Sequence, residues 1–123
     1  MQNLITDPII LTKKLISFPS ITPETGDSLD FMENLLKEIG FQVVMKKFED
    51  IDASSKPTWN IYAYTKKSPA RNITFIGHID VVHSGHHSDW TYPPFEPTVD
   101  NGILYGRGAC DMKAAIACFC VAS

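Results

Sequence analysis

The chain has 123 residues, of which 44% are hydrophobic and 20% are charged, a composition typical of a soluble globular protein with one modest core. Its formal net charge is −3, and charged residues are spread along the whole chain, so no basic surface for nucleic acid or anionic membranes is indicated. The apolar runs are too short to cross a bilayer, and the start lacks the basic residues of a secretory signal. We therefore expect a cytoplasmic protein without a nucleic-acid or membrane partner.

Three cysteines lie close together in the sequence, namely Cys110, Cys118 and Cys120. They form no Cys-x-x-Cys pair, which argues against a zinc knuckle or a redox motif. Reduced thiols are therefore the prediction. Cys118 and Cys120 fall within an apolar helical pattern, so we expect both to be small buried hydrophobic residues without a chemical role.

Two helices are predicted in the first third of the chain. Asp7 followed by Pro8 places a capping side chain before a residue suited to a first helical turn, which predicts a helix over residues 9–17. Apolar residues then recur at helical spacing over residues 29–39, and Gly40 follows as a typical helix end.

Three strands are predicted to follow. Residues 41–48 and 59–65 mix β-branched and aromatic residues with polar ones, and a loop over residues 50–57 connects them. Residues 72–82 are almost continuously apolar, which is typical of a strand buried on both faces. We expect this third strand to lie in the centre of a sheet.

The last third predicts a hairpin and a helix. The Asn101-Gly102 dipeptide separates two short β-like runs within residues 98–106. Residues 112–121 are Ala-rich and apolar nearly all round, which predicts a buried helix. Because this helix reaches Ser123 without a closing signal, we expect the chain to be truncated. Together the elements predict an α/β fold, a three-layer sandwich with a mixed, mainly parallel central sheet.

Two polar side chains, His78 and Asp80, interrupt the end of the predicted central strand. Their spacing places them on one face, and ligands of α/β sheets bind at strand ends. A neutral imidazole is a common zinc ligand, and a nearby carboxylate can fix its tautomer. The spacing alone leaves two interpretations open, a metal site or a histidine with a structural role.

Asp111 precedes the last predicted helix. One interpretation is an ordinary helix N-cap, although Ala114 occupies the position where a capping box has Glu or Gln. The other is a carboxylate that bridges two cations with its two oxygens. Because His78 ends a predicted strand and Asp111 opens the following helix, we predict that the two side chains face one cavity.

Other polar residues nearby are open to misinterpretation. His83, His86 and His87 form a His-rich loop that resembles a zinc cluster, but exposed surface residues are the favoured interpretation. Arg107, between two glycines, is suited either to binding a substrate carboxylate or to an ion pair that braces the turn, and the second role is commoner.

Several motifs taken together resemble the metallopeptidase family that contains succinyl-diaminopimelate desuccinylase, acetylornithine deacetylase, aminoacylases and glutamate carboxypeptidases. The resemblance covers nearly the whole chain, including Ser20-Ile-Thr-Pro23 and Gly40-Phe41, and corresponds to roughly the first third of a typical member. Its main motifs are Gly77-His-Ile-Asp-Val-Val82, Trp90, Pro93-Pro-Phe-Glu-Pro97, Asp100-Asn-Gly102 and Leu104-Tyr-Gly-Arg-Gly-Ala-Cys-Asp-Met-Lys113.

The resemblance implies roles for three residues. His78 matches a ligand of one zinc, Asp80 matches the catalytic aspartate that orients it, and Asp111 matches the carboxylate that bridges two zinc ions, which cobalt can replace. It also implies a cis peptide bond between Asp111 and Met112. The general base, the remaining ligands and the substrate-binding residues have no matching positions, so the ligand set is incomplete. The sequence departs from the family at His83 and Cys110, which are not matched ligands.

The resemblance also implies an activity and a domain plan. Residues 1–123 would be the amino-terminal part of a zinc-exopeptidase-like catalytic domain, without its remainder or the family's dimerisation domain. The complete enzyme, a homodimer, would hydrolyse a small N-acyl amino acid, N-succinyl-LL-2,6-diaminopimelate, in lysine and diaminopimelate biosynthesis. Two alternatives stay open: another amidohydrolase of the family, such as an acetylornithine deacetylase or a carboxypeptidase, and a non-catalytic remnant of a truncated gene.

Overall fold

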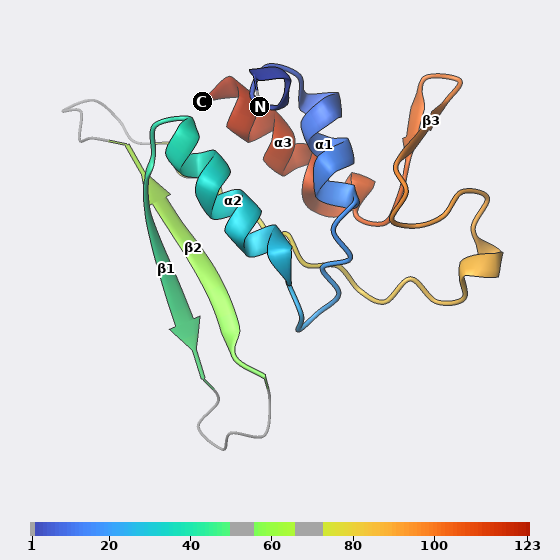
Figure 1. Cartoon of the computed structure of the whole chain (residues 1–123), viewed down its shortest axis with the longest axis horizontal. Coiled ribbons are helices and arrows are strands. Elements are labelled where there is room, and N and C mark those ends of the chain that lie inside the picture. The colour runs from blue at the N-terminus through green and yellow to red at the C-terminus, as the bar shows by residue number, and fades with distance from the viewer. Residues whose placement is uncertain (1, 50–55, 66–72) are drawn as a thin grey trace.

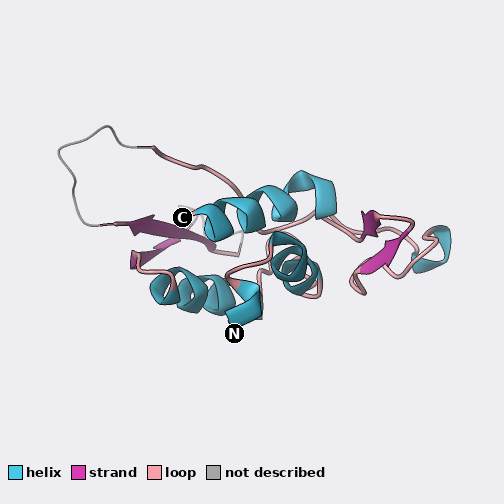
Figure 2. Ribbon diagram, turned by 90° about the horizontal axis from the view of Figure 1, so that it is seen from above, coloured by secondary structure: helices cyan, strands magenta, loops and turns pink. Residues whose placement is uncertain are grey.

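A computed structural model describes residues 2–49, 56–65 and 73–123. Three helices lie between two β-hairpins, which are found at opposite ends of the molecule in both views (Figures 1 and 2). The helices are α1 (Pro8–Ile16), α2 (Asp27–Glu38) and α3 (Ala114–Ala122), and short 3-10 turns cover Gln2–Leu4 and His87–Asp89. The strands are β1 (Gln42–Phe48), β2 (Thr58–Tyr64), β3 (Thr98–Asp100) and β4 (Ile103–Tyr105).

The two predicted N-terminal helices are confirmed. At the start of α1 the Asp7 carboxylate accepts hydrogen bonds from the backbone N–H groups of Ile9 and Ile10, at 2.8 and 3.3 Å. These bonds satisfy donors that have no partner within the helix, as expected of an N-cap before proline. After α2, Gly40 adopts a φ of 99°, which glycine tolerates at a helix end.

The hydrophobic core is built mainly by the three helices. Leu11 and Leu15 of α1 are at most 1% exposed and belong to a cluster that α2 and α3 complete. Residues spaced three and four apart form one face of each helix, which explains why the apolar spacing of α2 is a reliable signal. The remaining members of the cluster are Met32, Leu35, Leu36, Ile116, Ala117 and Cys120.

Both hairpins are antiparallel. In the first, β1 pairs with β2 so that Val44 lies opposite Tyr62, and the alternate side chains Val43 and Ile61 pack against the helical core. In the second, β3 pairs with β4 across the predicted Asn101-Gly102 turn, whose residues both have positive φ. The predicted strands and hairpin are confirmed here, whereas most of the predicted 50–57 loop lies outside the described residues.

The prediction of a central strand over residues 72–82 is wrong for its described part. Residues 73–80 form no strand, and one isolated parallel bridge joins Val81 to Ile21. Phe75 packs on the core and stacks on Phe119, but Ile73 and Ile76 are 92% and 86% exposed. The apolar pattern therefore identifies a segment that is suited to a sheet, but a strand needs hydrogen-bonded neighbours and the described residues supply them at Val81 alone.

The last helix, α3, is buried on one side and not all round. Ile116, Ala117 and Cys120 face the core, whereas Cys118 lies on the opposite face and is exposed. The prediction of burial is thus correct for Cys120 and wrong for Cys118, because an apolar sequence does not show which face of a helix lacks a partner. The α/β class is confirmed, and the described strands form two separate two-stranded sheets.

Candidate metal centre

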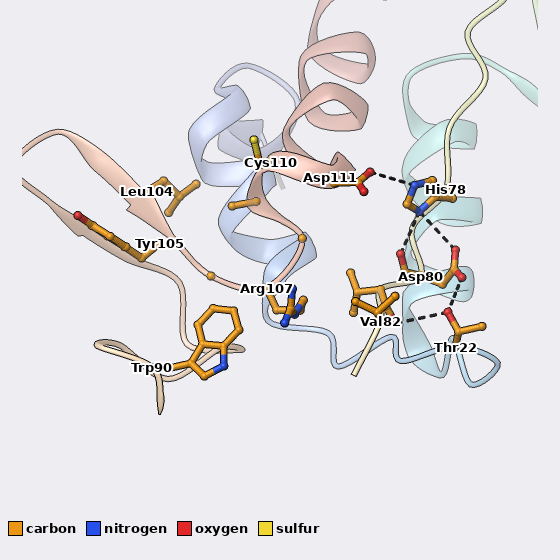
Figure 3. Close-up of a pocket in the computed structure, with 14 residues that line it drawn as sticks. Thr22, His78, Asp80, Val82, Trp90, Leu104, Tyr105, Arg107, Cys110 and Asp111 are labelled. Atoms are coloured by element: carbon orange, nitrogen blue, oxygen red, sulfur yellow. Dashed lines mark hydrogen bonds and ion pairs between the residues drawn. The ribbon is translucent and has the colours of Figure 1, made fainter. Parts of the chain in front are cut away.

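His78 is held by atoms that accept hydrogen bonds. Its Nδ1 lies 3.0 Å from the backbone oxygen of Asp80, which can only accept, so Nδ1 carries a proton. Its Nε2 lies 3.1 Å from a carboxylate oxygen of Asp111 (Figure 3). In neutral His78, Nε2 is an acceptor as well, so two lone pairs face each other. The geometry therefore requires a second proton or a cation between His78 and Asp111.

The charge of His78 responds to the same neighbours. The hydrogen bond to the Asp80 carbonyl is the largest cause that raises the pKa of His78. Partial burial opposes this change, while the negative charges of Asp80 and Asp111 add to it. The site thus favours positive charge at the position between the imidazole and the carboxylate.

Asp80 lies on the other side of His78 and has its own partner. Its carboxylate accepts a hydrogen bond of 2.6 Å from the Thr22 hydroxyl and lies 3.5 Å from His78 Nδ1. The imidazole is therefore oriented mainly by the Asp80 carbonyl, with the carboxylate further away, whereas the sequence suggested orientation by the carboxylate itself. The backbone of Val81, which bonds to Ser20 and Thr22, fixes this segment against the loop after α1.

Asp111 lies in a kinked turn, Ala109–Lys113, that leads into α3. No side-chain hydrogen bond caps this turn or α3, so the N-cap interpretation is wrong. The peptide bond between Asp111 and Met112 is cis, as the resemblance implies. His78 and Asp111 converge across 33 positions and line one cavity, as predicted, while their metal-binding role stays a prediction.

The donor atoms fit a zinc ion. Zinc binds histidine nitrogen and carboxylate oxygen at roughly 2.0–2.2 Å, so a tetrahedral ion would separate two such donors by roughly 3.4 Å. The observed separation of His78 Nε2 and Asp111 Oδ1 is 3.1 Å. Within the described ranges, no group of three or more His, Cys, Asp or Glu residues could hold a metal. The described residues thus provide a pair of suitable donors.

Lys113 is a residue whose role the sequence does not reveal. Its side chain is 1% exposed, and its ammonium donates 2.9 Å hydrogen bonds to the carbonyl oxygens of Leu15 and Phe18. Burial lowers the pKa of Lys113 to about 8, although the negative charge of Asp80 opposes the change. Lys113 therefore anchors the turn that carries Asp111 to the end of α1. Its partners lie 98 and 95 positions away, so no local signal indicates them.

The site opens into a cavity of about 440 Å³, which is within the usual range for small-molecule sites. Sequence reasoning missed Thr22 and Trp90 as cavity residues, although both lie in motifs of the resemblance. The three histidines of the loop, His83, His86 and His87, are exposed, in line with the surface interpretation. They do not line the cavity.

Residues 74–123 match the family model described as peptidase family M20/M25/M40. The chain is 44% identical over 117 residues to the succinyl-diaminopimelate desuccinylase of Wolbachia pipientis wMel, covering 94% of this chain and 27% of that protein. It is 40% identical over 119 residues to the desuccinylase of Ehrlichia ruminantium strain Gardel, covering 97% and 30% respectively. The resemblance to this metallopeptidase family is confirmed.

These curated relatives are more than three times as long as the region they share with the chain, which spans 27–30% of their length. Among solved structures, human carnosine dipeptidase 1 superposes with a TM-score of 0.79 over 92% of this chain and 26% of that one. Since the sequences are 20% identical, this likeness concerns the fold. No helix in the described part of the chain is long and apolar enough to cross a membrane.

Proposed function

We propose that residues 1–123 are the amino-terminal part of the catalytic domain of a zinc-dependent amide hydrolase. The complete enzyme would hydrolyse N-succinyl-LL-2,6-diaminopimelate to succinate and LL-2,6-diaminopimelate. The main support is the contact of His78 Nε2 with Asp111 Oδ1 at 3.1 Å, where two acceptors require a positive charge between them. Identity of 40–44% to desuccinylases supports the choice of substrate.

Each residue of the site has a proposed task. His78 would hold a metal ion through Nε2, and Asp111 would supply carboxylate oxygens to the same centre. Asp80 would keep the imidazole in the tautomer that presents Nε2, because its backbone carbonyl engages the Nδ1 proton, and Thr22 would hold the Asp80 carboxylate in place. When bound by these residues, zinc, or cobalt in its place, would supply Lewis-acid chemistry for the activation of water and of the amide carbonyl.

The same proposal gives the complete protein its wider features. We propose a three-layer sandwich with a mixed, mainly parallel sheet, a homodimer made through a separate domain, and a cytoplasmic role in lysine and diaminopimelate biosynthesis. The exposed side chains of Ile73 and Ile76 support further structure packed on this segment, because apolar side chains gain stability when they are covered.

The 123 residues alone are expected to show negligible turnover. A catalytic zinc normally takes three protein ligands and keeps one open position. His78 and Asp111 supply one histidine and one bridging carboxylate, and no residue in the chain matches the family's general base. Proton transfer would therefore be lost together with tight metal binding.

The test is a hybrid in which these residues replace the matching region of the Wolbachia pipientis wMel desuccinylase. We expect the hybrid with zinc to hydrolyse N-succinyl-LL-2,6-diaminopimelate. His78→Ala should lower kcat/KM at least roughly 100-fold, because a ligand is removed. Asp80→Asn should lower it less, because this variant loses the carboxylate but keeps the backbone carbonyl that holds His78 Nδ1. The assay measures hydrolysis through the free amine that the reaction releases.

His86→Ala is the matched control, because it removes an exposed histidine that does not line the cavity. The control should retain the activity of the unmodified hybrid. A His78→Ala hybrid as active as the control would overturn the assignment of the ligand. A folded, zinc-loaded hybrid without activity on this substrate would overturn the proposed reaction.

A further inference from the structure

Arg107 lies in the cavity that His78 and Asp111 also line. Figure 3 shows it beside Trp90, away from the His78–Asp111 pair. Among the described residues that line the cavity, Arg107 is the only lysine or arginine. The cavity thus has one region suited to cations and, separately, a permanent positive charge.

The position of the guanidinium group is fixed by its surroundings. Its Cζ lies 4.8 Å from the centre of the Trp90 ring, and the Trp90 indole N–H donates a 2.9 Å hydrogen bond to the Ser84 carbonyl. The Arg107 backbone N–H bonds to Pro94 O at 2.7 Å. Stacking and backbone bonds therefore hold the side chain before any ligand arrives, which lowers the entropy cost of binding.

The backbone next to Arg107 is also tightly packed. Gly106 has a φ of +155°, and a Cβ there would lie 2.6 Å from Ile16 Cγ2. Gly108 has a φ of +82°, and a Cβ there would lie 2.7 Å from Val81 Cγ1. Both glycines thus allow the turn to approach α1 and the His78 segment closely, so Arg107 is presented from a rigid turn.

The hydrogen-bonding capacity of Arg107 is largely unused. Its Nη2 donates to His83 O at 3.4 Å, a long contact, and its Nε is buried without a partner. No carboxylate among the described residues forms an ion pair with it. The sequence favoured an ion pair that braces the turn, and that expectation is wrong here. A guanidinium has five donors arranged to match a carboxylate.

We propose that Arg107, stacked on Trp90, binds a carboxylate group of the substrate at a distance from the amide that reacts. This inference rests on the proposed function, because both the succinyl group and the diaminopimelate moiety carry carboxylates. Arg107 is a binding and specificity residue, since Lys or Gln at this position would lose the planar pair of donors.

Succinate binding to the 123-residue chain in EDTA tests the inference without any metal. A Trp59→Phe background leaves Trp90 as the fluorescent reporter beside Arg107, because the chain has two tryptophans. We expect saturable quenching or enhancement with a Kd of roughly 1–10 mM, as for one charge-assisted contact in water. Arg107→Gln should weaken binding at least roughly tenfold, and Arg107→Lys should be intermediate.

Lys47→Gln is the matched control, since it removes the same charge from an exposed lysine of β1 that lies outside the cavity. Far-UV circular dichroism checks that each variant is folded, and Arg107→Lys keeps the test valid if Arg107→Gln unfolds. Succinamate, in which one carboxylate is an amide, and LL-2,6-diaminopimelate distinguish the two sources of the carboxylate.

Saturable binding of succinamate that weakens in Arg107→Gln assigns Arg107 to the acyl side, because succinamate keeps the free carboxylate and the amide of the succinyl group. Saturable binding of diaminopimelate that weakens in the same variant assigns Arg107 to the amine side. The inference would be overturned if neither compound gave a saturable response. It would also be overturned if folded Arg107→Gln and Arg107→Lys bound succinate as tightly as the chain that keeps Arg107. The hybrid enzyme separates the two proposals. If the hybrid is active but the Kd of succinate for the 123-residue chain does not depend on Arg107, this inference alone is defeated. An inactive hybrid with Arg107-dependent binding defeats the proposed function.

Discussion

The turn Ala109–Lys113 joins two regions that use polar side chains in opposite ways. Lys113 points into the molecule, is 1% exposed and donates to two carbonyl oxygens at the end of α1. Asp111, two residues earlier, has a side chain that is 86% exposed and contacts His78. The buried region satisfies its polar groups with the chain itself, whereas the cavity region leaves donors and acceptors available.

This difference separates residues that maintain the fold from residues suited to ligands. A buried ammonium is tolerated because its hydrogen bonds compensate for the loss of water. The acceptors of the cavity face each other at His78 and Asp111, and Arg107 keeps a buried donor without a partner. Unused capacity of this kind, on a rigid turn, is what a binding site requires.

Thiol reactivity should show the largest difference between the two regions. Cys110 lines the cavity and is exposed, whereas Cys120 is buried in the helical core, where burial raises its pKa to about 11. Because the thiolate is the reactive form, alkylation of Cys120 at pH 8 should be at least roughly 100-fold slower than that of Cys110. Mass spectrometry of peptides after timed iodoacetamide labelling measures both rates.

Cys118, which is exposed on α3, provides the internal control and should react like Cys110. Labelling in urea should make all three rates similar. If Cys120 reacted as fast as Cys118 in the native chain, the burial of Cys120 in the core built by α1, α2 and α3 would be contradicted.

The stability of the chain should respond to Lys113 and hardly at all to Asp111. Lys113→Met leaves the carbonyls of Leu15 and Phe18 without donors, while it removes the cost of burying a charge. The lost hydrogen bonds should dominate, and we expect the free energy of unfolding to fall by about 2 kcal/mol. Asp111→Asn should change it by less than about 0.5 kcal/mol, because the side chain is exposed.

Urea denaturation followed by circular dichroism measures both variants. A Lys113→Met chain as stable as the wild type would mean that relief of desolvation offsets the hydrogen bonds, and Lys113 would then not be an anchor.

The local elements were predictable from sequence because their signals are local. The Asp7-Pro8 cap, the apolar spacing of α2 and the Asn101-Gly102 turn each act within a few residues, and each forms the expected element. The structure of residues 73–80 was not predictable in this way, because strand formation depends on neighbours that lie elsewhere in the chain.

The site was predictable in part for the same reason. The expected places of His78 at the end of a strand and of Asp111 before the last helix predicted their convergence correctly, across 33 positions, although residues 73–80 form no strand. They did not reveal that the Asp80 carbonyl lies closer to His78 than its carboxylate does. The contacts of Lys113 and the stacking of Arg107 on Trp90 link distant segments, and such contacts follow from packing and not from any local pattern.

Zinc titration of the 123-residue chain, followed by NMR of the histidine side-chain nitrogens, tests the central claim most directly. The chain has four histidines, which His→Gln variants assign. We predict that zinc shifts the Nε2 signal of His78 first, and that Asp111→Asn weakens this binding roughly tenfold because one of the two donors is lost. If zinc shifted His83, His86 and His87 first and left His78 unchanged, the metal centre proposed at His78 and Asp111 would be contradicted.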